Sequence, residues 1–348
     1  MKSLKKGGDA VSSNFIIEEG KLLAYTGHLQ DLVVPNDVTS IAEKAFFNNI
    51  TLRSIILPEG FSSIEEGAFR GCENLKTILI PNTITNIDYE VFEECNNLEY
   101  NVYDNACYLG NNDNPYLVLI KAKDRDITSC EIYPNTRLIH HKAFSRCENL
   151  TNIEIPKTVI SIGSLAFIQC SSLSSVTIPD EVSKIGNAIF HHCNSLRGYV
   201  FDNAYYVGNE ENPYRLLVKA IDYDIITCEI HKDTKYILDY AFRFCENITE
   251  LTIPEGLKCI KKYAFIHCTN LEKIILPKSL VELPGLAFYR CTNLKKIFYK
   301  GTSKDFLNSG LFLSSKLFDK VHYYCETKPS IEGKNWHYDK TYNILEWK

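Results

Sequence analysis

The sequence predicts an α/β solenoid, a right-handed stack of about twelve coils with one parallel β-sheet face and short helices or turns on the other. The first observation behind this prediction is a phrase, CENLKTILIP at residues 72–81, that returns as CENLTNIEIP at 147–156 and as CENITELTIP at 245–254. The second is a period of 23 residues, and the third is a longer period of 98 residues. Periods of about 20 to 50 residues are typical of solenoids, in which each unit buries its apolar face against the next.

Phenylalanines mark the shorter period, with steps of 23, 23 and 52 residues that recur along the chain. They are Phe46, Phe69, Phe92, Phe144, Phe167, Phe190, Phe242, Phe265 and Phe288. Each unit reads Leu-x-x-Ile-x-Ile-Pro, followed by Ile and then by Ala-Phe-x-x-Cys. The alternating apolar residues of the first half predict a short strand, which proline ends because it has no N–H to donate. The second half should return the chain as a short helix or turn that buries Ala, Phe and Cys.

The longer period contains a larger unit that is present twice. Residues 103–132 align with residues 201–230, with many identical residues 98 positions apart. This unit lacks the Ala-Phe-x-x-Cys half and has two β-rich runs, 107–110 and 116–121, around a turn rich in Gly, Asn, Asp and Pro. We therefore expect a hairpin-bearing coil every 98 residues.

These periods divide the chain into four segments. Residues 1–14 are predicted to be a disordered tail, 15–31 an N-terminal cap formed by a hairpin, 32–299 the solenoid, and 300–348 an aromatic-rich C-terminal cap. Caps are expected because the terminal coils of a solenoid would otherwise expose the core.

The unit Leu-x-x-Ile-x-Ile-Pro…Ile…Ala-Phe-x-x-Cys resembles the BspA-type leucine-rich repeat of bacterial surface proteins, over roughly residues 28–300. The tail FYKGTSKDF…VHYYCETKPSIEGKNWHY resembles the C-terminal segment of such arrays in gut Firmicutes. The resemblance implies a leucine-rich-repeat solenoid at the cell surface or secreted, which adheres to or binds a host surface or matrix protein. The first residues, MKSLKKGGDAVSSNF, include no apolar signal-peptide core, which predicts a cytoplasmic protein if the chain is full length.

Eight of the 13 cysteines follow a phenylalanine by three residues. We expect a buried ladder of free thiols, because cysteine packs as a small apolar residue with a weak donor. Metal binding is disfavoured because ligands must converge on one point, whereas these residues are spread along a line. Disulfides between adjacent coils are an alternative, since a strand spacing of about 5 Å is within disulfide range, but stacked equivalent side chains point in parallel. The predicted ladder is Cys72, Cys95, Cys147, Cys170, Cys193, Cys245, Cys268 and Cys291.

Composition and motifs exclude several function classes. The net charge of −5 does not favour nucleic acid or anionic membranes, and no run of about 18 apolar residues could span a bilayer. The sequence has no known catalytic, phosphate-binding or dinucleotide-binding motif, so we expect neither an enzyme nor a cofactor. The pairs His140–His141 and His191–His192 lack partners at ligand spacing, and the GNNDNPY and GNEENPY loops lack the acidic ladder of a calcium site. No metal site is predicted, and we expect a monomer.

This organisation predicts a non-enzymatic module that binds a protein partner through its strand face. In each strand, the residue between the last two core positions should point outward and form one column across the coils. Apolar members of this column are the most informative, because soluble monomers seldom expose large apolar patches without use. The alternative is that β-branched residues simply suit an open sheet. The predicted column is Val33, Ile56, Leu79, Glu131, Glu154, Thr177, Glu229, Thr252, Ile275 and Phe298.

Other surfaces and functions remain as alternatives. Loops on a rigid scaffold often bind partners, and the hairpin residues proposed for this role are Asn114, Tyr116, Asn212 and Tyr214. The aromatic C-terminal segment, with Trp336 and Trp347, could instead bind carbohydrate by stacking. An intracellular scaffold is a further alternative function.

Overall fold

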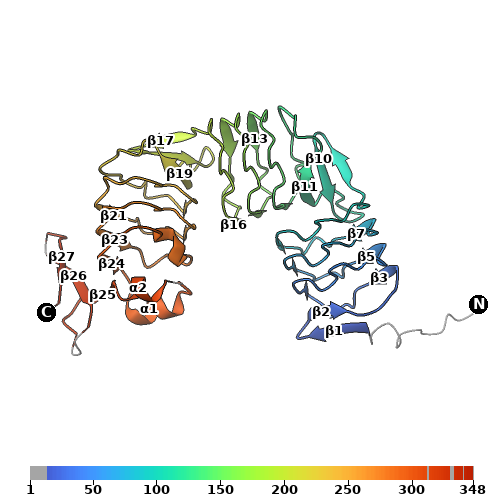
Figure 1. Ribbon diagram of the computed structural model, residues 1–348, viewed down its shortest axis with the longest axis horizontal. Coiled ribbons are helices and arrows are strands. Elements are labelled where there is room, and N and C mark those ends of the chain that lie inside the picture. Colours follow the sequence, from blue (N-terminus) through green and yellow to red (C-terminus); the bar gives the residue numbers. More distant parts are fainter. Residues whose placement is uncertain (1–13, 312, 330–332, 340, 348) are drawn as a thin grey trace, which may run out of the picture. The chain divides into compact units, whose positions relative to one another are not determined.

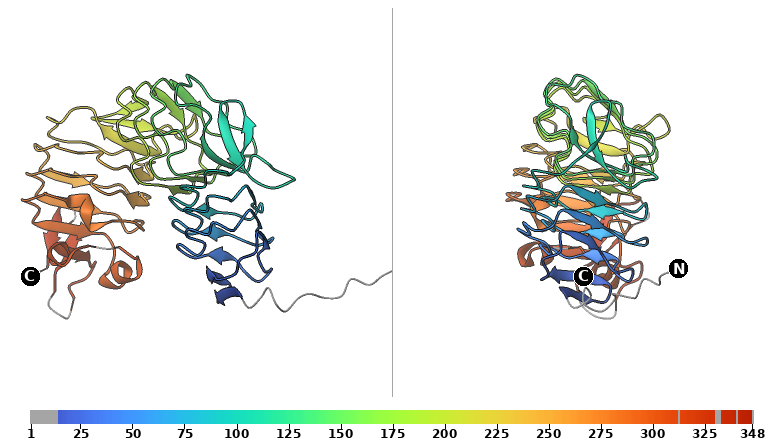
Figure 2. Two further views of the ribbon diagram at one scale, coloured as in Figure 1. Left: turned by 45° about the vertical axis from the view of Figure 1, so that its right-hand side comes forward. Right: turned by 90° about the vertical axis from the view of Figure 1, so that its right-hand side faces the viewer.

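The computed structural model of the protein describes residues 14–311, 313–329, 333–339 and 341–347. The chain forms two compact units: unit 1 comprises Met1–Leu173 and Pro179–Ser195, and unit 2 comprises Ser174–Ile178 and Leu196–Lys348. Within each unit, coils with parallel strands stack on one another (Figures 1 and 2), which confirms the predicted solenoid. The predicted tail at residues 1–14 lies, except for Asn14, outside the described residues.

Unit 1 begins with an antiparallel hairpin and continues as two ladders of parallel strands. The hairpin strands are β1 (Phe15–Glu18) and β2 (Lys21–Tyr25), and β2 pairs in parallel with the short strand β4. The 23-residue period sets the register, so Leu32, Ile55 and Ile78 are aligned on successive coils and are all buried. The first ladder contains β3 (Asp31–Val33), β5 (Ser54–Ile56) and β7 (Thr77–Leu79). The second contains β4 (Ser40–Ile41), β6 (Ser63–Ile64) and β8 (Asn86–Ile87).

The larger repeat unit adds three antiparallel strands to unit 1. Strand β10 (Ala106–Leu109) pairs with β9 (Asn101–Tyr103) on one side and with β11 (Val118–Ala122) on the other. Strand β11 then begins a second run of short parallel strands, namely β12 (Leu138–Ile139), β14 (Ser161–Ile162) and β16 (Lys184–Ile185). Unit 1 also contains β13 (Asn152–Glu154).

Unit 2 repeats this arrangement 98 residues later. The antiparallel strands β17 (Tyr199–Phe201), β18 (Ala204–Val207) and β19 (Leu216–Ala220) lead into the short parallel strands β20 (Tyr236–Ile237) and β22 (Cys259–Ile260). The longer parallel ladder contains β21 (Glu250–Thr252), β23 (Lys273–Leu276) and β24 (Lys296–Tyr299). Unit 2 also contains β15 (Ser175–Thr177) and the 3-10 helix η2 (Gly285–Phe288).

The C-terminal segment, in which the sequence has no repeat, continues the last sheet of unit 2. Helices α1 (Ser303–Asn308) and α2 (Ser315–Phe318) precede three further strands, β25 (Val321–Tyr324), β26 (Asn335–Tyr338) and β27 (Ile344–Glu346). Strands β25 and β26 extend the ladder in parallel, and β27 pairs with β26 in antiparallel. None of the helices in the described part of the chain is long and apolar enough to cross a bilayer.

The Ala-Phe-x-x-Cys half is a hydrogen-bonded turn in the coils that have it up to residue 284, whereas in the last copy Ala287 and Phe288 belong to η2. Between residues 28 and 284, all of which the structure describes, no helix occurs, so of the two predicted forms the turn is the one found. The reason is local: in these turns one residue before and one after the Ala-Phe pair, such as Lys44 and Asn48, have φ near +57° and +56°, which a right-handed helix does not allow. The turns are joined between coils instead, as when the Phe46 N–H donates to the Ala68 carbonyl oxygen at 2.8 Å.

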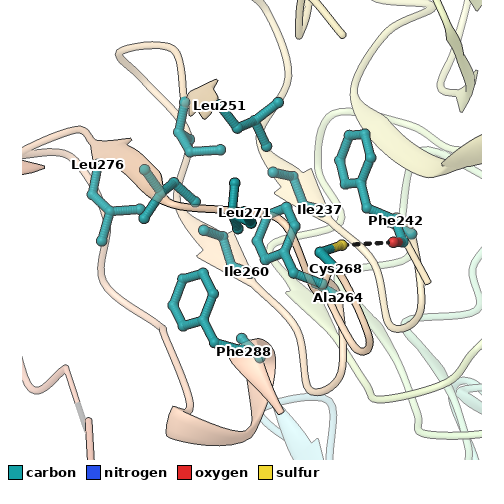
Figure 3. Packing of buried hydrophobic residues seen from close by; sticks show 14 of the residues in the cluster. Ile237, Phe242, Leu251, Ile260, Ala264, Cys268, Leu271, Leu276 and Phe288 are labelled. Atoms are coloured by element: carbon teal, nitrogen blue, oxygen red, sulfur yellow. Dashed lines mark hydrogen bonds between the residues drawn. The ribbon is translucent and has the colours of Figure 1, made fainter. Parts of the chain in front are cut away.

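The core of each unit is a column of stacked aromatic rings flanked by aliphatic residues. In unit 1 the Phe144 and Phe167 rings are 5.3 Å apart and nearly parallel, and in unit 2 the Phe242 and Phe265 rings are 5.4 Å apart. Figure 3 shows Leu251, Leu271 and other residues of unit 2 packed around these turns. Because the 23-residue coils contribute the same set of residues, neighbouring coils of this kind share one core within each unit.

Candidate binding face

The outward column of unit 1 begins with three apolar side chains on adjacent strands. Register pairs Val33 with Ile56 and Ile56 with Leu79, so the three residues are aligned across β3, β5 and β7. Val33 is 63% exposed, Ile56 is 42% exposed and Leu79 is half-buried. Their strand neighbours point into the core, as expected for alternating side chains. The result is an apolar strip, which we call the unit 1 column.

The equivalent column in unit 2 is covered by the chain itself. Register aligns Thr252, Ile275 and Phe298 across β21, β23 and β24. Thr252 is exposed, but Ile275 is only 5% exposed and Phe298 only 2%, because both pack against Trp336 of β26. The expectation that Ile275 and Phe298 form part of an open binding face is therefore corrected.

Aromatic packing and polar contacts hold the C-terminal strands β26 and β27 against the column of unit 2. Trp336 is fully buried, its ring centroid lies 5.5 Å from that of Phe298, and its indole N–H donates to the Tyr299 carbonyl oxygen at 3.1 Å. Glu346 of β27 forms an ion pair with Lys296 of β24. The expectation that Trp336 could stack on a sugar is also corrected, because no face of its ring is accessible.

Trp347, the second tryptophan considered for stacking, is half-buried. Its indole N–H donates to the Cys325 carbonyl oxygen at 2.9 Å, and its ring stacks on His337 with centroids 3.9 Å apart. Both its polar atom and one ring face are therefore already used within the chain.

The remaining members of the predicted column are polar and exposed. Glu131 and Glu154 belong to unit 1, and Thr177 and Glu229 belong to unit 2. The carboxylate of Glu131 already has a partner within the chain, since it accepts a hydrogen bond from the Tyr103 hydroxyl at 2.8 Å.

The hairpin residues hold their own loops together. In unit 1 the Asn114 side-chain amide donates to the Asn135 carbonyl oxygen at 2.9 Å, and the Tyr116 ring packs 4.5 Å from that of Tyr133. All four residues proposed from the sequence are half-buried. In unit 2 the Asn212 amide donates to the Asp233 carbonyl oxygen at 3.3 Å, and the Tyr214 ring stacks 4.0 Å from that of His231.

A cleft of about 430 Å³ adjoins the unit 1 column at Leu79, and sequence reasoning missed it. It is lined by residues of β7, by the start of β9 and by the hairpin loop; they include Leu79, Glu99, Tyr100, Asn101, Leu109 and Asn112. The cleft exists because β9 pairs with β10 and leaves β7 as the edge of its sheet. The signal that could have found it is the larger repeat unit at residues 103–132, which interrupts the regular 23-residue strand spacing. We call it the Leu79 cleft.

The cysteine ladder lies on the turn side of the core. All 13 cysteines are free, and the eight that follow phenylalanines are buried. In six of these eight the thiol donates to the carbonyl oxygen of the phenylalanine 26 residues earlier, as Cys268 does to Phe242 at 3.0 Å (Figure 3). Burial raises the pKa of the Cys72 thiol to about 12 and has the same effect on Cys95. The thiols of Cys72 and Cys95 are therefore protonated at neutral pH, which disfavours nucleophilic or metal-binding chemistry at these two residues.

The paired histidines of unit 1 are held neutral by burial. Burial lowers the pKa of His140 to about 3 and that of His141 to about 4, and neither Nδ1 atom has a hydrogen-bond partner in the structure. The ring of His140 instead packs edge-on to Phe92, with centroids 5.9 Å apart. Across the residues that the structure describes, no group of three or more His, Cys, Asp or Glu side chains could hold a metal ion.

Comparison with known proteins gives one family and several solved structures. The profile of the BspA-type leucine-rich repeat region matches residues 19–112, 122–210 and 222–332, in six copies. No curated protein matches the chain.

Three solved structures illustrate the similarity. A leucine-rich cell surface protein from Faecalibacterium prausnitzii is 22% identical, with a TM-score of 0.30, covering 86% of this chain and 96% of that one. A leucine-rich repeat protein from Bacteroides ovatus is 20% identical, with a TM-score of 0.33 and coverage of 87% of both chains. A leucine-rich repeat protein from Eubacterium ventriosum is 18% identical, with a TM-score of 0.34, covering 85% of this chain and 89% of that one.

Proposed function

Because the chain belongs to the BspA-type leucine-rich repeat family, we propose that it is a non-enzymatic module that binds another protein through the unit 1 column. Arrays of this kind are interaction modules, since a rigid stack of coils presents side chains from many strands on one surface. The partner we propose is a host surface or matrix protein, bound by a molecule that is exported to the cell surface.

One observation supports the choice of the unit 1 column. Apolar residues occupy the same outward strand position in both units, yet only those of unit 2 are buried under the chain's own C-terminal segment. Val33 and Ile56 remain exposed, and their burial against a partner would each contribute roughly 1 to 2 kcal/mol. Exposed, aligned apolar side chains beside a cleft are typical of protein-binding surfaces.

The proposal is tested by affinity capture with the purified full chain, in parallel against host extracellular proteins and against lysate of the producing cells. Bound proteins are identified by mass spectrometry, and the Kd of each identified partner is then measured for the wild type and for two variants. Val33→Lys combined with Ile56→Lys places two charges in the unit 1 column and should weaken binding at least tenfold. Thr252→Lys is the matched control, because it adds the same side chain at the same strand position in unit 2.

The outcomes separate the candidates. A host surface or matrix protein that is lost with the double variant and kept with Thr252→Lys supports the proposal. A partner found only in the producer's lysate favours the intracellular scaffold and overturns the proposed surface role. Binding that is unchanged by the double variant, with circular dichroism showing an intact fold, overturns the assignment to the unit 1 column.

A further inference from the structure

We infer that the Leu79 cleft is the anchor pocket of the unit 1 column, and that it takes an aromatic side chain, best a tryptophan, from an extended segment of a protein partner. This inference rests on the proposed function and specifies its ligand. It combines two features of the described chain: the uncovered apolar column and the way in which the chain covers the same column in unit 2.

Unit 2 shows what kind of group fits this strand face. There the occupant is Trp336, presented by the strand β26, and its indole lies against Ile275 and Phe298. The single polar atom of the indole is satisfied by the Tyr299 carbonyl oxygen at 3.1 Å. An apolar column at this strand position is therefore closed by an extended segment that inserts one large aromatic ring. The column of unit 1 occupies the same strand position and is apolar at all three residues, but no described segment of unit 1 covers it.

The Leu79 cleft offers an aromatic ring both apolar walls and a polar partner. Leu79, Tyr100 and Leu109 are apolar or aromatic lining residues, and the exposed Glu99, which carries a carboxylate, is a further lining residue of the same cleft. Its volume of about 430 Å³ is within the range of sites that enclose small organic groups. An indole needs one hydrogen-bond acceptor when it is buried, and a carboxylate supplies it. A tryptophan is also the residue that most often dominates binding at such pockets.

The unit 1 column, which lies beside the cleft, would contact the other residues of the partner's extended segment. Val33, Ile56 and Leu79 lie on three adjacent strands, so the column is about 10 Å long at a strand spacing of about 4.8 Å. An extended segment advances about 3.3 Å per residue, so three to four residues cover the column while the next residue enters the cleft.

The second copy of the larger repeat unit serves as an internal control. At an offset of 98 residues, Glu99 corresponds to Arg197 and Tyr100 to Gly198. Unit 2 therefore lacks both the aromatic wall and the acidic acceptor of the cleft, although the strands around them are repeated. We expect the aromatic anchor to bind at unit 1 alone.

The test uses a displayed library of random 12-residue peptides selected on the full chain. Enriched peptides are then synthesised, and their Kd values are measured by fluorescence anisotropy. We expect enrichment of tryptophan, followed by tyrosine and phenylalanine, and at least a tenfold loss of affinity when the aromatic residue of a peptide is changed to alanine. Selection of peptides without aromatic residues, or no selection above background, overturns the inference.

Variants of the protein locate the site. Tyr100→Ala removes an aromatic lining residue of the cleft. Asn112→Trp instead fills the cleft from an exposed loop position, so the test still stands if one of the two variants fails to fold. Each should weaken peptide binding at least tenfold, whereas Tyr199→Ala, at an exposed tyrosine in β17 of unit 2, should leave it unchanged. Peptide affinity that is equal in all variants overturns the inference.

The same measurements separate this inference from the proposed function. If a protein partner depends on Val33 and Ile56 but no aromatic peptide binds, the proposed function stands and the anchor pocket does not. If neither proteins nor peptides depend on the unit 1 column, both are wrong.

Discussion

Replacing His140 with leucine should remove much of the acid sensitivity of unit 1. His140 is buried, its Nδ1 atom has no hydrogen-bond partner, and it packs against Phe92. The chain itself shows that leucine fits, because the equivalent position 98 residues later in unit 2 is Leu238, which is also buried. The substitution therefore removes a titratable group while keeping an apolar side chain at a core position.

The magnitude follows from the difference in pKa between the two states. Burial lowers the pKa of His140 in the folded protein to about 3, whereas an unfolded histidine titrates near its ordinary value of about 6.5. Between these values the unfolded state binds a proton that the folded state does not, so the free energy of unfolding falls as pH decreases below about 6.5. Each pH unit is equivalent to about 1.4 kcal/mol, so the loss from His140 at pH 5 is about 2 kcal/mol.

The assay is urea denaturation at pH 7 and pH 5, followed by circular dichroism and by hydrogen exchange of amides in unit 1. The wild type should lose about 2 kcal/mol more than His140→Leu between these two pH values, since His141 and the carboxylates are common to both. The reciprocal variant Leu238→His should gain a similar sensitivity in unit 2. The reasoning is refuted if wild type and His140→Leu lose the same free energy of unfolding between pH 7 and pH 5.

Three further substitutions test the packing, each by its thermal midpoint. Cys268→Ala should lower the free energy of unfolding by about 1 to 2 kcal/mol, because it removes a buried thiol and leaves the Phe242 carbonyl oxygen without that donor; an unchanged midpoint would contradict this. Trp336→Ala should cost about 3 to 5 kcal/mol, since a fully buried aromatic ring is lost, and a loss below about 1 kcal/mol would show that the cover is not packed. Gly163→Ala should cost about 1 to 3 kcal/mol, because the added Cβ would lie 2.5 Å from the His141 amide nitrogen, and a raised midpoint would contradict the close approach of these backbones.

Much of the candidate binding face follows from the repeat, but its accessibility does not. The period places Ile56 and Phe298 at the same strand position, and the structure agrees with that placement. Periodicity does not reveal which of the two is covered, because the covering residue, Trp336, lies in a segment with no repeat. The Leu79 cleft was missed for a related reason. It depends on β9 pairing with β10 instead of extending the sheet of β3, β5 and β7, and the sequence period does not predict this pairing.

The sequence by itself determined the coil, its strands and its core. Alternation of apolar residues places Leu32, Ile55 and Ile78 inside, and a constant period brings them into register, so both features are local and repeat in every unit. Only the tertiary structure decided that the Ala-Phe half is a turn, since left-handed residues such as Lys44 are stabilised by hydrogen bonds from one coil to the next. The tertiary structure alone also decided that Trp336 covers the apolar column of unit 2, whereas the unit 1 column is exposed. The reason is that Trp336 contacts residues far away in the sequence, and it lies in a segment without a repeat, so no period predicts the contact.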